Sequence, residues 1–387
     1  MTRRMTPGGR GRRPPKPTAS TPAADATSFL PPYPPSWVDR LTRWVDRLPG
    51  PYWAYYLGAF AVTNLVLAAA HWSAGWYRPW SFDRVHVLMA AGMPLLFLMM
   101  TYFNQAVVRA LEDFRAAFLD TSAEFQAYDY RLTTLPAWPA LAAGVSFGGG
   151  VVIIAGIDPA LPSRLTSMTI PSRLLHALLL AFDISPQPVP AALGLSLAAL
   201  SWLAMGAFAY QLLRQLRMIS EIYTHHSRVD LFELSPLYSL SRHTARVSIT
   251  ILIFNGLLSG LYPDIYASVG SLIILGLFLA VLAASFLLPQ LGVHRLLEKE
   301  KERMIAENGA MLKAVIADLH RRVTRRRLGG MDDLNKTMAS LEIERAALMR
   351  IPTWPWAPET LRTVVAALLF PIVVWVTQQI LGGALGG

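Results

Sequence analysis

The sequence predicts an all-α membrane protein with seven transmembrane helices, an N-terminus inside the cell and a C-terminus outside. Hydrophobic residues fill 53% of the 387 positions and charged residues only 16%, against about 25% charged residues in a soluble domain. The charged residues fall between long charge-free stretches, and most basic residues belong to alternate connecting segments. The absence of cysteine excludes a disulfide scaffold, and the apolar composition excludes a disordered chain.

Each predicted transmembrane helix is a stretch that contains no Asp, Glu, Lys or Arg. A helix that crosses the apolar core of a bilayer needs about 17 to 25 residues. Six stretches meet that length, and the fifth reaches it because Arg246 at its end can extend its side chain to the membrane surface. The stretches are residues 52–70, 85–108, 136–157, 189–213, 247–262, 268–293 and 363–382.

The basic residues predict the orientation. With the N-terminus inside, 31 of the 35 Lys and Arg residues lie in the inside segments 1–51, 109–135, 214–246 and 294–362. Only four arginines lie outside, and an excess of Lys and Arg marks cytoplasmic loops. The net charge of +10 is therefore a topology signal, and we expect no nucleic-acid partner. The expected location is the plasma (inner) membrane, with the lipid bilayer around a multi-pass chain.

Composition divides the chain into four parts. Residues 1–48 are predicted to form a disordered, basic, Pro-rich tail. Residues 49–293 hold six transmembrane helices, two of which continue into the cytoplasm. Residues 294–357 are predicted to form a coiled-coil-like helical hairpin and a linker rich in Trp and Pro. Residues 358–387 hold the seventh helix and a short outside tail.

The predicted hairpin depends on apolar residues at helical spacing. Gly329 and Gly330 break the outgoing helix, and Asp332 or Asp333 begins the returning one. The outgoing face carries Leu297, Met304, Met311, Val315, Leu319 and Val323, and the returning face carries Leu334, Met338, Leu341 and Leu348.

Polar groups inside the predicted spans are the candidates for transport. No acidic or basic residue lies within a span, which argues against a proton-coupled pump. Thr377, Gln378 and Asn255 are candidate pore-lining residues, and Pro371 is a candidate gate or kink in the last helix. For any single one of these polar groups, we favour a hydrogen bond between packed helices over a pore lining. Asn104 with Gln105 forms a further neutral polar pair.

Small residues predict where helices approach closely. Gly144 and Gly148, and likewise Gly256 and Gly260, have the four-residue spacing that brings two membrane helices together.

Trp354 and Trp356, before the last helix, are predicted interfacial anchors. Five arginines mark the tip of the hairpin, which is either a solvated tip or a binding site for anionic phospholipid. They are Arg321, Arg322, Arg325, Arg326 and Arg327.

The sequence contains no recognisable catalytic motif, so we expect no enzyme activity and no cofactor. Glu221 and His225, four residues apart on a predicted helix, are the best pair for a metal ion. Such acid–histidine pairs are also ordinary on helix surfaces, and we predict no metal site.

The topology resembles that of the insect-chemoreceptor type of seven-transmembrane ion channels. The shared features are an inside N-terminus, an outside C-terminus, and helices prolonged into a cytoplasmic anchor before a separate last span. The resemblance rests on topology and not on a sequence motif. It implies a homo-oligomer in which the seventh helix lines a central cation pore.

Two functions are therefore open. The first is an oligomeric ion channel or ligand-sensing channel with the seventh helix at the pore. The alternative is a non-transporting membrane scaffold or sensor whose cytoplasmic helices recruit partners.

Overall fold

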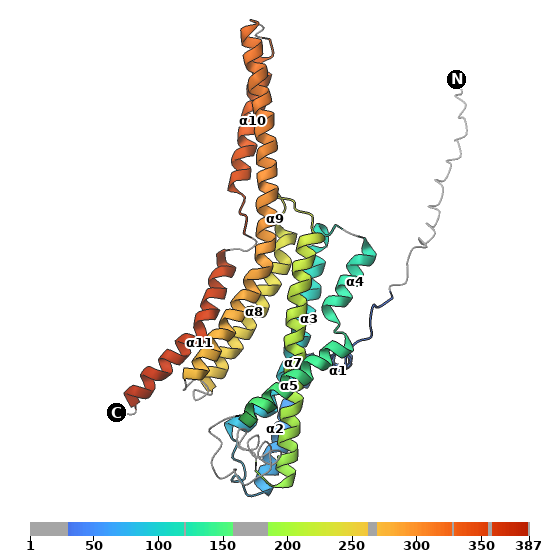
Figure 1. Cartoon of the computed structure of the whole chain (residues 1–387), viewed down its shortest axis with the longest axis vertical. Helices are drawn as coiled ribbons and strands as arrows, with labels where there is room; N and C mark the ends of the chain where they lie inside the picture. Colours follow the sequence, from blue (N-terminus) through green and yellow to red (C-terminus); the bar gives the residue numbers. More distant parts are fainter. Residues whose placement is uncertain are drawn as a thin grey trace, which may run out of the picture. The chain divides into compact units, whose positions relative to one another are not determined.

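In the computed structural model, residues 30–119, 121–157, 185–261, 269–326, 329–354 and 358–385 are described, and these segments contain helices and no strand (Figure 1). Two isolated bridges, Pro35 with Pro136 and Phe118 with Ser227, join connecting segments. The α-helices, with one short 3-10 helix η1 (Arg115–Ala117), are α1 (Trp37–Asp46), α2 (Tyr52–Ser73), α3 (Arg84–Phe114), α4 (Ser122–Thr133), α5 (Ala137–Ile157), α7 (Pro188–His225), α8 (Ser235–Leu261), α9 (Val269–Thr324), α10 (Met331–Arg350) and α11 (Pro358–Leu385).

Three described helices are long and apolar enough to cross a membrane. They are α2, α3 together with η1, and α7. Many of the large apolar side chains on α2 are exposed, as is expected where lipid rather than protein covers a helix. The all-helical fold and the association with membrane are thereby confirmed.

Helices α3 and α7 continue beyond the length that a bilayer requires, as the sequence predicts. Their extensions meet α4, α8 and α9 in a second hydrophobic core, which is separate from the core around Phe97, Phe103 and Leu252. Phe114 and Tyr223 are fully buried in this second core and make an edge-to-face ring contact at 5.7 Å. Each large apolar side chain that is transferred from water into such a core contributes about 2 kcal/mol.

Helix α1 corrects one expectation, because residues 37–46 are helical and not part of a disordered tail. Ser36 and Asp39 form a reciprocal capping box at the helix start. Val38 and Val45 are buried on the side that meets α2 and α3, while Trp44 is exposed. Burial of one apolar side and the cap explain why so polar a segment is ordered. Residues 1–29 lie outside the described residues.

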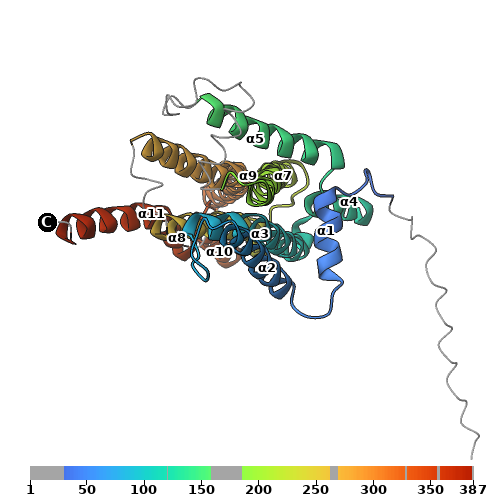
Figure 2. The ribbon, with the colours of Figure 1, turned by 90° about the horizontal axis from the view of Figure 1, so that it is seen from below.

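Close packing at glycines is confirmed for two helix pairs. Figure 2 shows α5 beside α7, with which it makes its most extensive contacts. At this crossing a Cβ added to Gly206 would lie 2.4 Å from the carbonyl oxygen of Ala143 and 2.7 Å from the Cα atom of Gly144. Helix α11 packs on α8 at Gly256, against the ring of Phe370. Only glycine, which has no Cβ atom, lets the neighbouring helix come this close without a rearrangement.

Helices α9 and α10 form an antiparallel hairpin (Figure 1). Helix α9 has 56 residues, which corresponds to about 84 Å at 1.5 Å per residue. The turn uses positive φ angles at Arg326 and Gly330. The returning helix begins at Met331, which puts both predicted aspartates in its first turn. The packing face differs from the prediction at Met311 and Val323, which are exposed.

Polar contacts hold the hairpin together at three levels. Lys301 Nζ donates to the carbonyl oxygens of Met349 and Ile351 at 3.0 and 2.8 Å. Asn308, only 2% exposed, donates from Nδ2 to the Leu341 carbonyl and to Glu344, at 3.0 Å each. Near the turn, Arg322 bonds Asp318 and the Gly329 carbonyl.

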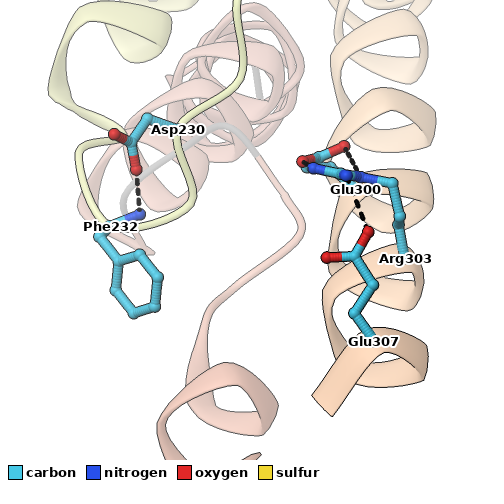
Figure 3. A network of polar contacts seen from close by, with 5 residues as sticks. All are labelled: Asp230, Phe232, Glu300, Arg303 and Glu307. Carbon is cyan, nitrogen blue, oxygen red and sulfur yellow. Dashed lines mark hydrogen bonds and ion pairs between the residues drawn. The ribbon is translucent and has the colours of Figure 1, made fainter. Parts of the chain in front are cut away.

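On the solvent side of α9, Arg303 joins Glu300 and Glu307 (Figure 3). Figure 3 also shows a turn in the α7–α8 connection, where the Phe232 amide donates to Asp230 at 2.9 Å. Exposed ion pairs add little stability. The burial of Asn308 and Leu341 therefore contributes more to the stability of the hairpin than these pairs do.

Candidate functional site

A layer of buried polar side chains crosses the helices near the ends of the apolar stretches. On one side, Asn104 Oδ1 of α3 accepts hydrogen bonds from Gln211 and Gln215 of α7, at 2.7 and 3.2 Å. On the other side, Gln290 of α9 donates to Thr244 of α8 at 2.8 Å. We call Asn104, Gln211, Gln215, His243, Thr244 and Gln290 the polar layer.

His243 connects the two sides of the polar layer. Burial lowers the pKa of His243 to about 3, and the neighbouring positive charge of Arg246 acts in the same direction. The imidazole is therefore neutral at physiological pH. Within the described protein, His243 Nδ1 and Gln215 Oε1 are buried without hydrogen-bond partners. Both residues line a cavity of about 10 Å³, the size of a single water molecule.

The end of α4 supplies backbone acceptors to this layer. Gln215 donates to the Leu132 carbonyl at 3.0 Å, and Asn104 donates to the Thr133 carbonyl at 3.3 Å. One residue further on, the Thr134 carbonyl accepts from Arg214 at 2.6 Å and from the Tyr33 hydroxyl at 2.9 Å. The carbonyls at the C-terminus of a helix lack partners within that helix, so α4 ends where α7 provides donors.

Asp39 joins α1 to the same place. Its Oδ2 atom accepts from the Ser36 amide, the Ser36 hydroxyl and the Leu135 amide at 3.0, 2.7 and 2.9 Å. The residue is 2% exposed. Burial raises the pKa of Asp39, whereas the hydrogen bonds from Ser36 and Leu135 favour the charged form. The carboxylate thus ties the start of α1 to the α4–α5 connection.

A polar cavity of about 220 Å³ lies between α1, α3 and α4. Two carboxylates, one guanidinium, two amides and three hydroxyls line it, together with Val108: Asp39, Asp46, Arg43, Asn104, Gln105, Thr42, Thr101 and Thr133. Burial raises the pKa of Asp46. The neutral polar pair Asn104 and Gln105, which the sequence analysis singles out, therefore lines this cavity.

The polar groups of the lining can hold water or a small polar solute. The Thr42 and Thr133 hydroxyls donate to backbone carbonyls, and the Thr101 hydroxyl pairs with the Tyr56 hydroxyl. None of these three hydroxyls is bonded to a carboxylate in the described segments, so the cavity presents no activated nucleophile.

The candidate pore residues lie on two helices that pack together. Thr377 is exposed on α11, and its hydroxyl donates to the Val373 carbonyl at 2.8 Å. Asn255 is half-buried on α8. Helix α11 is continuous through Pro371. The side chains of Pro371 and Gln378 lie outside what the structure describes.

The other predicted residues fall into separate places. Glu221 accepts a hydrogen bond from the Tyr128 hydroxyl at 3.0 Å, and His225 is exposed. No group of three or more His, Asp or Glu residues that could hold a metal ion occurs in the described segments. The Trp354 ring stacks on His294 with centroids 4.0 Å apart. Trp356 lies outside the described residues.

The arginines of the hairpin tip differ in their contacts. Arg321, Arg325 and Arg326 are exposed, and Arg322 is held by Asp318 and Gly329. Arg327 lies outside the described residues. The hairpin tip therefore carries three exposed arginines among the described residues.

The fold and the polar layer define an all-helical, membrane-associated protein with a buried polar network between its helices. Compared with known protein families, with curated proteins and with solved structures, the chain matches none of them.

Proposed function

We propose that this protein is a membrane scaffold or sensor whose α9–α10 hairpin assembles with the hairpin of a second copy. In this proposal α2, α3, α5, α7, α8, the first half of α9 and α11 cross the membrane. The N-terminus and the hairpin then lie in the cytoplasm, as the distribution of basic residues favours.

The observation that carries this proposal is the continuity of α9. One unbroken helix runs from the apolar segment at Val269 to Thr324 at the hairpin tip. A continuous helix transmits a displacement of its membrane part to the hairpin, which a flexible connection would not. Among the described helices, α10 makes its extensive contacts with α9, and only the base of the hairpin, at Leu297 and Leu348, is buried in the second hydrophobic core.

One side of the hairpin is suited to a partner helix. Helical periodicity places Ile305, Ile316 and Val323 on one side of α9. Val323 is 52% exposed, Ile316 is half-buried, and Ile305 packs against the second hydrophobic core. On α10, Met349 is 62% exposed. Apolar residues left in water favour association, and methionine adapts to a partner surface.

The absence of cysteine from the chain permits a direct test by disulfide cross-linking in membranes. In an oligomer whose symmetry axis runs along the membrane normal, equivalent residues lie at the same height. Val323→Cys is therefore expected to give cross-linked dimers under mild oxidation. Ala317→Cys, exposed on a different side of α9, is the matched control and is expected to remain monomeric. Equal cross-linking of both variants, or of neither, would contradict the proposal.

An oligomeric channel is the second candidate, and the surface of α11 favours it. This helix packs on α8 and leaves Val365, Leu369, Ile372, Val376 and Ile380 exposed along its length. Hydrophobic constrictions gate some pores by excluding water, and Thr377 is a polar group near them. Cation flux through liposomes that contain the purified protein would support the channel. Cross-linking of the Val323→Cys variant without cation flux would support the scaffold and contradict the channel.

A further inference from the structure

A groove of about 490 Å³ lies where α3, α8 and α11 meet. Arg242, Arg246 and Thr250 of α8 line one wall, and Tyr102 of α3 and Thr363 of α11 line the others. The groove is separate from the polar cavity beside α1 and from the hairpin tip. The groove has no role in the proposed assembly of hairpins or in the proposed pore.

The charge in the groove is unbalanced. Arg242 and Arg246 are four residues apart and both exposed, so their guanidinium groups repel each other along one face of α8. Among the described side chains no carboxylate lines the groove, and neither arginine forms an ion pair within the described segments. Arg242 Nε makes a long hydrogen bond, 3.4 Å to the Tyr238 carbonyl. The chemistry that would satisfy this pair is a phosphate group.

Apolar side chains next to the arginines indicate that the phosphate belongs to a lipid. Along α8, Ile249, Ile253 and Leu257 follow Arg246 at the spacing of one helix face. Ile253 and Leu257 are exposed, and Ile249 lines the groove. The arginines come immediately before the charge-free stretch 247–262. An amphiphile with an anionic head and apolar tails matches this order of charges and apolar side chains.

We infer that the groove between α3, α8 and α11 binds an anionic phospholipid of the cytoplasmic leaflet. Arg242 and Arg246 hold its phosphate, and the apolar face of α8 holds an acyl chain. The inference rests on the proposed topology, which puts residues 214–246 at the cytoplasmic surface. There, basic pockets between transmembrane helices bind anionic head groups.

The test measures the thermal stability of the purified full-length protein in detergent during titration with phosphatidylglycerol. The melting temperature of the wild type is expected to rise, and phosphatidylcholine is expected to have no such effect. In the double variant Arg242→Gln/Arg246→Gln, the apparent affinity for phosphatidylglycerol is expected to fall about thirtyfold. The matched control is Arg295→Gln/Lys299→Gln, an exposed basic pair with the same spacing on α9, which should behave as the wild type.

Three outcomes would overturn the inference. The first is an unchanged phosphatidylglycerol response in Arg242→Gln/Arg246→Gln. The second is an equal loss in Arg295→Gln/Lys299→Gln. The third is an equal shift with glycerol phosphate or inorganic phosphate, which would indicate a soluble anion. If the double variant fails to fold, Arg242→Lys/Arg246→Lys is used, and it should retain the charge but bind more weakly.

Cross-linking through Val323→Cys in the same membranes separates this test from the proposed function. Loss of the lipid response with cross-linking retained refutes the lipid site alone. Cross-linking lost with the lipid response retained refutes the scaffold alone.

Discussion

Replacement of Gly206 by alanine is expected to destabilise the protein by about 3 kcal/mol, the upper part of the range for overpacking a close contact. The added Cβ would lie 2.4 Å from the Ala143 carbonyl oxygen and 2.7 Å from the Gly144 Cα atom. Both are backbone atoms, so no side chain can rotate away, and α5 must move off α7. The measurement is reversible unfolding in detergent, or the melting temperature if unfolding is irreversible.

Gly58→Ala provides the control for that experiment. Gly58 is also inside a long apolar helix, but an added Cβ there would meet nothing within 4 Å. Alanine favours helix over glycine by about 1 kcal/mol, so this variant should equal or exceed the wild type in stability. If Gly206→Ala were as stable as Gly58→Ala, the close crossing of α5 and α7 would be wrong.

Asp39→Ala is expected to have the second large effect. It removes the acceptor of three hydrogen bonds, from the Ser36 amide, the Ser36 hydroxyl and the Leu135 amide. Loss of the helix cap and the burial of an unsatisfied amide together cost about 3 kcal/mol. Helix α1 should therefore detach locally. Trypsin would then cleave at Arg40 and Arg43, which the folded helix protects in the wild type.

Two variants control for this result. Asp39→Asn keeps one side-chain oxygen as an acceptor and should lose less stability than Asp39→Ala. Asp332→Ala removes an exposed aspartate at the start of α10, where its pairing with Lys336 is open to solvent. Such pairs contribute about 0.2–1 kcal/mol. Equal tryptic cleavage in the Asp39→Ala and Asp332→Ala variants would contradict the role of Asp39 in holding α1.

The membrane helices could be predicted because their signal is local. A charge-free run can be recognised without knowledge of any partner, and so the sequence predicts α2, α3 and α7 close to their observed positions. The same holds for the hairpin turn at Gly329 and Gly330 and for the close contacts at Gly144 and Gly256. Each of these features depends on a residue type and a spacing within one stretch of chain.

Helix α1 and the polar layer depend on distant partners instead. The Arg and Asp residues of α1 resemble the basic tail before it, and only the spacing of Ser36 and Asp39 marks a helix start. Gln211 and Gln215 share a helix face, but nothing in the sequence identifies Asn104 and the end of α4 as their partners. In the hairpin, Asn308 is buried although it is polar, and Met311 is exposed although its spacing predicts a packed position.

The length of α9 also determines how far a small movement in the membrane is amplified. About 30 residues lie between His294 and the end of the helix at Thr324, which makes an arm of about 45 Å. A tilt of only about 5° at the base of that arm would swing its end by about 4 Å, roughly three quarters of the rise of one helical turn. In the proposed scaffold, the hairpin would therefore act as a lever that converts a slight reorientation among packed helices into a displacement large enough to separate or align two neighbouring hairpins.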